Sequence, residues 1–249
     1  MATILFGDSI AKGITYSNQK LTLTDEPIVD ALNQLYGISI DNKSVYGQTL
    51  KRIHDKRLIE QTIIQLDPNE KHYVIIAVGG NDADYDWKMV GENPKLTHQP
   101  KTPLPLFEEI LTYYVTYLKD KDITPILLTT VPLISKRYFE EVVSKAGNPE
   151  NILKFFNQDI EMIFRHHEAY SHVITKIAYS YNCVLVDIRT SLLHQTNYND
   201  YISKDGIHPN QKGYNLILSI IQDKLISDET MRQWIDFQQT AHDLSQTYL

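Results

Sequence analysis

Five short apolar segments, rich in residues that favour strands, recur along the 249-residue chain at intervals long enough for a helix. This spacing predicts alternating strands and helices, and hence a sheet of parallel strands. Each segment is almost continuously apolar, which is typical of strands that helices cover on both faces. We therefore expect an α/β three-layer sandwich around a five-stranded parallel sheet. The five segments are TILFG (3–7), ISID (38–41), HYVIIAVG (72–79), TPILLTTV (124–131) and CVLVDI (183–188).

The segments between these strands predict helices, and two stretches match no regular element. Both irregular stretches, 85–105 and 132–149, follow the carboxyl end of a predicted strand. Ligands bind at that edge of an open parallel sheet, so we expect both stretches to form pocket walls. The helices are predicted at about 25–36, 49–66, 104–119, 150–180 and 210–226.

The chain shows no repeat, low-complexity tract or linker that would divide it. We expect one domain over residues 1–227, with a C-terminal helical extension, 228–249, packed on it. In this extension Met231, Trp234 and Ile235 form an apolar stripe at helical spacing, within a predicted helix at about 228–245. Such a stripe packs on its own domain or contacts another copy in a homo-oligomer, and the sequence favours the first.

Composition excludes several classes of protein. The chain carries 24 basic and 31 acidic residues, a net charge of -7, and no run of Lys and Arg, so nucleic acid is not an expected partner. Cys183 is the only cysteine, which excludes an internal disulfide or a thiolate metal cage and favours a reducing compartment. No apolar segment approaches the ~18 residues of a membrane span, and the amino terminus lacks the basic start of a signal peptide. We expect a cytoplasmic protein, unless a leader has been removed.

A serine follows the first predicted strand directly. In Gly7-Asp8-Ser9, the glycine lets the backbone turn sharply, so that the hydroxyl of Ser9 lies at the carboxyl edge of the sheet. A serine hydroxyl is a poor nucleophile at neutral pH and needs a positioned base, usually a histidine that a carboxylate orients. Alone, the three residues are more typical of an ordinary turn.

An acid and an imidazole lie three residues apart just before the last predicted helix. Asp205 is close enough in sequence to His208 for its carboxylate to reach Nδ1, while Nε2 points outward. Acyl transfer also needs hydrogen-bond donors for the oxyanion of the tetrahedral intermediate. Asn81 follows the third strand and offers a side-chain amide, and Gly47 follows the second strand and lets its backbone N–H approach a ligand.

Four blocks, in their order along the chain, resemble the SGNH hydrolase superfamily, also called GDSL lipases and esterases. They are Gly-Asp-Ser after the first strand, Gly47 after the second, Gly-x-Asn-Asp (79–82) after the third and Asp-x-x-His-Pro (205–209) near the end. The resemblance covers residues 5 to 209. It implies a flavodoxin-like sandwich, and an activity that hydrolyses carboxylic esters or thioesters, deacetylates sugars or transfers acyl groups without a cofactor or metal. The expected partner is a small-molecule ester. One departure is that Ile10 stands where the family usually has leucine, and it keeps the position apolar.

The resemblance also implies roles for individual residues. The nucleophile of the family falls on Ser9, and its acid and base fall on Asp205 and His208. The oxyanion donors fall on Gly47 and Asn81, with the backbone N–H of Ser9 as the third. The function expected on this basis is a serine-dependent esterase or acylhydrolase that forms an acyl-enzyme intermediate. A carbohydrate O-acetyl esterase and a catalytically inactive binding module of the same fold are the alternatives.

Other motifs in the sequence fit their families less well. The Gly-x-Ser-x-Gly elbow of α/β-hydrolases follows several strands, whereas Ser9 follows the first. His167 and His172 flank Glu168 in a pattern similar to a zinc metalloprotease helix, but five residues separate them, so they cannot share one helix face. We expect these three to be polar positions on a solvated helix. Of the alternating acids after the third strand, we expect Asp82 to support the oxyanion loop, and Asp84 and Asp86 to be solvated.

Overall fold

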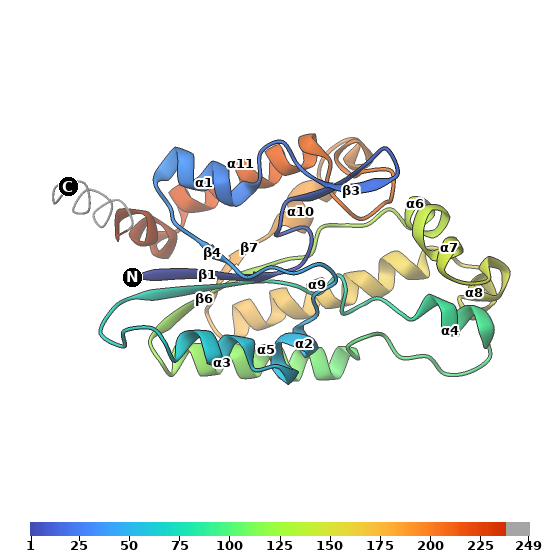
Figure 1. Cartoon of the computed structure of the whole chain (residues 1–249), viewed down its shortest axis with the longest axis horizontal. Coiled ribbons are helices and arrows are strands. Elements are labelled where there is room, and N and C mark those ends of the chain that lie inside the picture. Colours follow the sequence, from blue (N-terminus) through green and yellow to red (C-terminus); the bar gives the residue numbers. More distant parts are fainter. Residues whose placement is uncertain (238–249) are drawn as a thin grey trace.

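The computed structural model describes residues 1–237 and contains a five-stranded parallel sheet. Figure 1 shows this sheet between two layers of helices, which confirms the predicted fold class. The strand order is β4-β1-β5-β6-β7, so the first strand lies inside the sheet and the chain crosses over it before adding further strands. The strands are β1 (Ala2–Gly7), β4 (Asp41–Asn42), β5 (His72–Ala77), β6 (Ile123–Leu128) and β7 (Val184–Val186).

Side chains alternate between the two faces of the sheet, and each face has its own core. Along β1, Ile4 and Phe6 enter one core, whereas Leu5 enters the other. The first core packs under α2 (Leu50–Asp55), α3 (Leu58–Ile63), α5 (Leu104–Lys119) and α9 (Met162–Ser180). The second packs under α1 (Ile28–Tyr36), α10 (Ile188–Leu193) and α11 (Gln211–Ser227).

Two predicted helices are each divided in two. The helix expected at 49–66 forms α2 and α3, and Arg57 between them has a φ of 51°. The helix expected at 150–180 forms α8 (Pro149–Phe155) and α9, and Asn157 and Gln158 between them have φ values of 52° and 64°. A non-glycine residue in the left-handed region cannot continue an α-helix. The apolar periodicity of the sequence does not reveal such a change of direction.

The second predicted strand is shorter than expected. Only Asp41 and Asn42 pair with β1, whereas Ile38 is fully buried in the segment before the strand. The apolar residues of ISID therefore pack in the core without joining the ladder. The other four predicted strands and the helices expected at 25–36, 104–119 and 210–226 are confirmed.

Both stretches that were expected to be irregular contain short helices. In Figure 1 these helices lie together beyond the carboxyl ends of the strands. They share a third apolar cluster, which includes Trp87, Tyr138 and Ile152. Elements of three to six residues carry too little periodicity to be recognised in a sequence. They are α4 (Trp87–Glu92), α6 (Ser135–Tyr138), the π-helical segment η1 (Phe139–Val143) and α7 (Ser144–Ala146).

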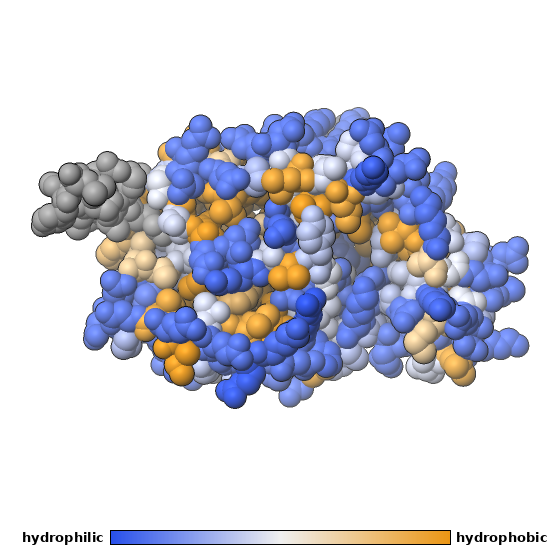
Figure 2. Space-filling model, viewed as in Figure 1, coloured by the Kyte–Doolittle hydropathy of each residue, from blue (hydrophilic) through white to orange (hydrophobic). Residues whose placement is uncertain are grey.

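An antiparallel hairpin, β2 (Ile14–Ser17) and β3 (Lys20–Leu23), was also not predicted. Its turn is formed by Asn18 and Gln19, which both have positive φ values. Leu21 and Leu23 of β3 are exposed, and Figure 2 shows hydrophobic side chains gathered over this hairpin and α1.

The segment after α11 returns to the sheet. Residues 229–237 are helical, and Met231 and Trp234 are buried in the second core. The indole Nε1 of Trp234 donates a hydrogen bond to Thr3 Oγ1 at 2.8 Å. The rest of the predicted extension, residues 238–249, lies outside the described residues. The division at residue 227 stays a prediction.

Candidate active site

Ser9 lies two residues beyond β1, at the carboxyl edge of the sheet, and is 8% exposed. The turn that carries it needs a glycine at position 7. A Cβ on Gly7 would lie 2.3 Å from the Cβ of Ala11 and 3.3 Å from the carbonyl oxygen of Ala77. No other residue fits in this space, so the close approach of these backbones determines where the hydroxyl of Ser9 is presented.

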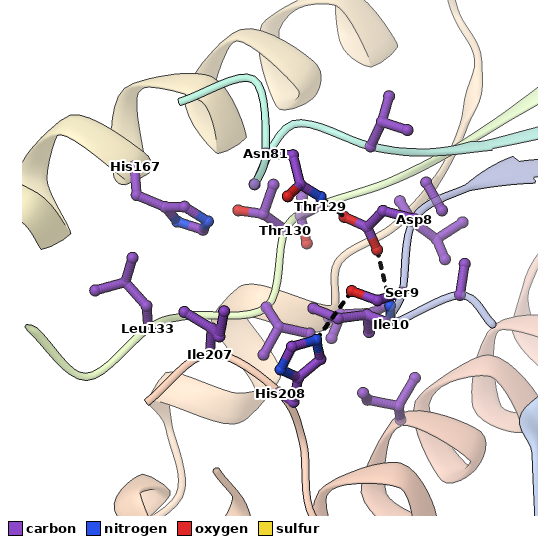
Figure 3. Close-up of a pocket in the computed structure, with 18 of the residues that line it drawn as sticks. Asp8, Ser9, Ile10, Asn81, Thr129, Thr130, Leu133, His167, Ile207 and His208 are labelled. Carbon is purple, nitrogen blue, oxygen red and sulfur yellow. Dashed lines mark hydrogen bonds between the residues drawn. The ribbon is translucent and has the colours of Figure 1, made fainter. Parts of the chain in front are cut away.

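A chain of hydrogen bonds connects Ser9 to the acid and imidazole of the last loop, and Figure 3 shows its first link, between Ser9 and His208. Ser9 Oγ lies 2.9 Å from His208 Nε2, and His208 Nδ1 lies 2.5 Å from Asp205 Oδ2. The second carboxylate oxygen of Asp205 accepts from the backbone N–H groups of Ile207 and His208, at 3.3 and 3.2 Å. Both carboxylate oxygens are therefore engaged, and the orientation of Asp205 is fixed. The structure brings together three residues that the sequence predicted to act together.

The loop that carries Asp205 and His208 is held against α6. Gly206 has a φ of 79°, and its carbonyl oxygen accepts from Ile134 N at 2.8 Å. A Cβ on Gly206 would lie 2.5 Å from the backbone N of Tyr138, so only glycine allows this contact. Two residues after His208, Asn210 caps α11 by accepting from Gly213 N at 3.0 Å. These contacts place the imidazole next to Ser9.

The side chain of Asn81 is held next to Ser9 by Asp8. Asn81 Nδ2 donates to Asp8 Oδ2 at 3.1 Å, and Asp8 Oδ1 accepts from Ile10 N at 2.9 Å. Burial raises the pKa of Asp8, although these hydrogen bonds and the nearby His208 favour its charged form. No role for Asp8 was expected from the sequence. Its position between Gly7 and Ser9, next to the expected nucleophile, could have indicated a role in the site.

Asp82 connects the loop after β5 to the start of α2. Its carboxylate accepts from Leu50 N at 2.8 Å and from Thr102 Oγ1 at 2.5 Å, and burial raises its pKa to about 6. Gly47, with a φ of 64°, lies just before α2 and borders the same pocket as Asn81. The two segments that carry the predicted oxyanion donors are thus tied together through Asp82.

A mostly apolar cavity of about 350 Å³ lies beside Ser9 and His208. Both stretches that were predicted to form pocket walls contribute to it, through residues such as Tyr85, Trp87 and Leu133. Because Ser9 lines this cavity, an ester bound there could reach the hydroxyl group.

Asp84 supports this wall and is not solvated, contrary to expectation. It accepts hydrogen bonds at 2.7 Å from the indole of Trp87, the hydroxyl of Tyr138 and the ammonium of Lys101, and its side chain is 18% exposed. Asp86 caps α4 by accepting from Met89 N. Asp84 is only partly exposed because three donors from separate segments converge on it, which the sequence pattern could not show.

His167 is buried, although the sequence predicted a solvated position. It is 7% exposed and faces Arg189 of α10, whose Nη1 lies 3.2 Å from His167 Nδ1. Glu168 forms an ion pair with the same guanidinium, whereas His172 is exposed as expected. A sequence signal did exist: Tyr170 and the other buried residues of α9 recur at helical spacing from His167.

The sequence matches the model of the GDSL-like lipase/acylhydrolase family over residues 5–216. The chain belongs to this family. The match includes the serine turn, both loops with predicted oxyanion donors and the acid–imidazole loop, and it supports an esterase or acylhydrolase activity. No curated protein sequence matches the chain.

Solved structures share the fold at low sequence identity. A lipase/acylhydrolase from Enterococcus faecalis is 18% identical, with a TM-score of 0.56, over 90% of this chain and 95% of that one. An acetylxylan esterase from Geobacillus stearothermophilus is 21% identical, with a TM-score of 0.58, over 90% and 93%. A putative GDSL-like lipase from Parabacteroides merdae is 16% identical, with a TM-score of 0.56, over 88% and 93%. These likenesses establish the fold.

Two kinds of feature are absent from residues 1–237. Within this range, no three His, Cys, Asp or Glu side chains are grouped so that they could hold a metal ion. None of the helices in the same range combines the length and the apolar character needed to cross a bilayer.

Proposed function

We propose that the protein is a serine-dependent carboxylic ester hydrolase that works through an acyl-enzyme intermediate. The observation that carries this proposal is the unbroken chain of hydrogen bonds from Ser9 through His208 to Asp205, at the edge of a largely apolar cavity. This arrangement supplies a nucleophile, a base and an orienting carboxylate.

In the first half of the reaction, Ser9 Oγ attacks the ester carbonyl carbon while His208 Nε2 takes the hydroxyl proton. Asp205 then stabilises the imidazolium. The carbonyl oxygen becomes an oxyanion, which accepts hydrogen bonds from Asn81 Nδ2 and from the backbone N–H groups of Gly47 and Ser9. The amide of Asn81 has two hydrogens, so its bond to Asp8 leaves one for the oxyanion.

The tetrahedral intermediate then collapses, and the bond between the carbonyl carbon and the alcohol oxygen breaks. His208 returns its proton to the alcohol, which leaves, and the acyl group remains on Ser9. In the second half, a water molecule gives its proton to His208 and attacks the acyl-enzyme. Release of the carboxylic acid returns the proton to Ser9.

The test combines covalent labelling with turnover. A fluorophosphonate probe should label Ser9, and p-nitrophenyl acetate and butyrate should be hydrolysed at a rate that Ser9→Ala abolishes. Ser219→Ala is the matched control, because its hydroxyl bonds a backbone carbonyl of α11. Labelling of a different serine would refute the assignment of the nucleophile. Absence of both labelling and turnover would indicate a binding module that has lost catalysis.

A further inference from the structure

His167 lines the cavity opposite the reaction machinery and has no part in the mechanism above. Figure 3 shows its ring projecting from α9 toward Thr130 and Asn81, across the cavity from His208. The side chain is more than nine-tenths buried, and Nδ1 is engaged by Arg189. The hydrogen bonds among residues 1–237 leave its Nε2 without a partner.

Arg189 determines where the proton of this imidazole lies. A guanidinium can only donate, so His167 Nδ1 accepts, and the ring proton is on Nε2. Arg189 is itself anchored by the ion pair with Glu168 and by its backbone N–H, which donates to Thr129 Oγ1 at 2.9 Å. Burial, and secondarily the charge of Arg189, lowers the pKa of His167 to about 3. The ring is therefore neutral at physiological pH and presents an N–H donor.

The donor points into space that a substrate can occupy. A Cβ on Gly80 would lie 3.3 Å from His167 Nε2 and 4.0 Å from Asp8 Oδ2. The absence of a side chain at Gly80 thus leaves room between the imidazole and the loop that carries Ser9. The neighbouring carboxylate of Asp8 disfavours an anion here, so the fitting partner is a neutral oxygen.

We propose that His167 is a specificity-determining residue, and that its Nε2–H donates a hydrogen bond to a neutral hydroxyl, ether or carbonyl oxygen of the ester. This oxygen is not that of the reacting carbonyl group, and it belongs to the acyl or the alcohol portion. The inference rests on the proposed function. Nε2 faces the cavity, so a bound ester would exclude water from it. A donor that loses water without gaining another partner is costly, so esters with such an oxygen are favoured over their hydrocarbon analogues.

The experiment compares pairs of esters in which an ether oxygen replaces one methylene group. The acyl pair is p-nitrophenyl methoxyacetate and p-nitrophenyl butyrate, and the alcohol pair is methoxyethyl acetate and butyl acetate. Longer pairs move the oxygen along the chain one atom at a time. For each pair, kcat/KM is measured for the unmodified protein and for variants, so that differences in intrinsic reactivity cancel. The pair that responds shows which portion of the ester carries the oxygen.

His167→Leu should lower kcat/KM for one oxygen-containing ester about tenfold relative to its partner, which is the range of a neutral hydrogen bond. His167→Gln, which keeps an N–H donor, should restore part of this preference. His172→Leu is the matched control: His172 is exposed on the same helix, so the preference should not change. Equal changes for both members of every pair would show that His167 only supports Arg189, and would overturn the proposal.

A second readout separates this inference from the proposed function. Ser9-dependent hydrolysis of the hydrocarbon esters tests the function, whereas the preference within a pair tests His167. Binding of the same esters to Ser9→Ala, measured by calorimetry with and without His167→Leu, needs no turnover. A Kd preference for the oxygen-containing member that His167→Leu removes supports the inference, and a Kd ratio that this change leaves intact refutes it.

Discussion

Replacing Asp205 by Asn should inactivate the enzyme while preserving its fold. The two side chains have the same shape, but the amide must direct its oxygen and its NH₂ group to different partners. In the unmodified protein, Asp205 Oδ1 accepts from the backbone N–H groups of Ile207 and His208, and Asp205 Oδ2 contacts His208 Nδ1. Asp205 is 2% exposed, so solvent offers little replacement for a lost partner.

The two orientations of the introduced amide differ in cost. With its NH₂ group toward the backbone, two donors would lose their acceptor, at about 1–3 kcal/mol for each unpaired buried group. With its oxygen toward the backbone, the bonds from the N–H groups of Ile207 and His208 remain, and the NH₂ group donates to His208 Nδ1. The second orientation is therefore favoured. It places the ring proton on Nε2, where the imidazole can no longer accept the proton of Ser9.

An imidazole held in the wrong tautomer lowers kcat by about 10⁴ in comparable triads. At about 1.4 kcal/mol for each factor of ten, this corresponds to roughly 5.5 kcal/mol of lost transition-state stabilisation. The assay is kcat for p-nitrophenyl butyrate, together with urea unfolding to verify that the variant is folded. Asp200→Asn is the control, because that side chain is 58% exposed and should tolerate the change. A folded Asp205→Asn variant with more than a tenth of the original kcat would refute the reasoning.

Three further predictions concern an oxyanion donor, a buried acid and the C-terminal segment. Asn81→Ala should lower kcat by about 10² to 10³ with little change in KM, since one oxyanion donor is lost; an effect on KM alone would assign Asn81 to substrate binding. Burial raises the pKa of Asp82 to about 6, from an ordinary value of 3.8. Between these pH values the folded state keeps a proton that the unfolded state has released. The free energy of unfolding should therefore fall as pH rises between these values, and urea titrations of Asp82→Asn should lack this component of the fall. Trp234→Ala should cost about 3–5 kcal/mol in urea unfolding, because the indole is fully buried and bonds Thr3; a cost below about 1 kcal/mol would contradict the packing described.

Much of the candidate site could be predicted because its signals are local. Ser9 lies directly after a strand, and Asp205 and His208 lie in one short loop. The carboxyl ends of parallel strands meet at one edge of the sheet, so motifs that follow different strands converge whatever the intervening sequence. This argument also located Asn81 and Gly47.

The polar contacts between distant segments could not be predicted in this way. His167 and Arg189 are 22 residues apart and belong to helices on opposite faces of the sheet. The donors to Asp84 lie on three segments, and one of them, Tyr138, is 54 residues away in the sequence. A polar residue in a sequence is expected in solvent unless its partner is known, and only the folded chain shows the partner.

The parallel sheet, the two helical layers and the candidate residues at the carboxyl edge can be predicted from the sequence, because hydrophobic period and turn chemistry are properties of short segments. The breaks in the long helices, the short helices that line the cavity and the partners of each imidazole depend on the tertiary structure. Those outcomes depend on which surfaces and charges meet in space. Burial next to a guanidinium makes His167 a neutral donor, whereas contact with Asp205 orients His208 toward Ser9.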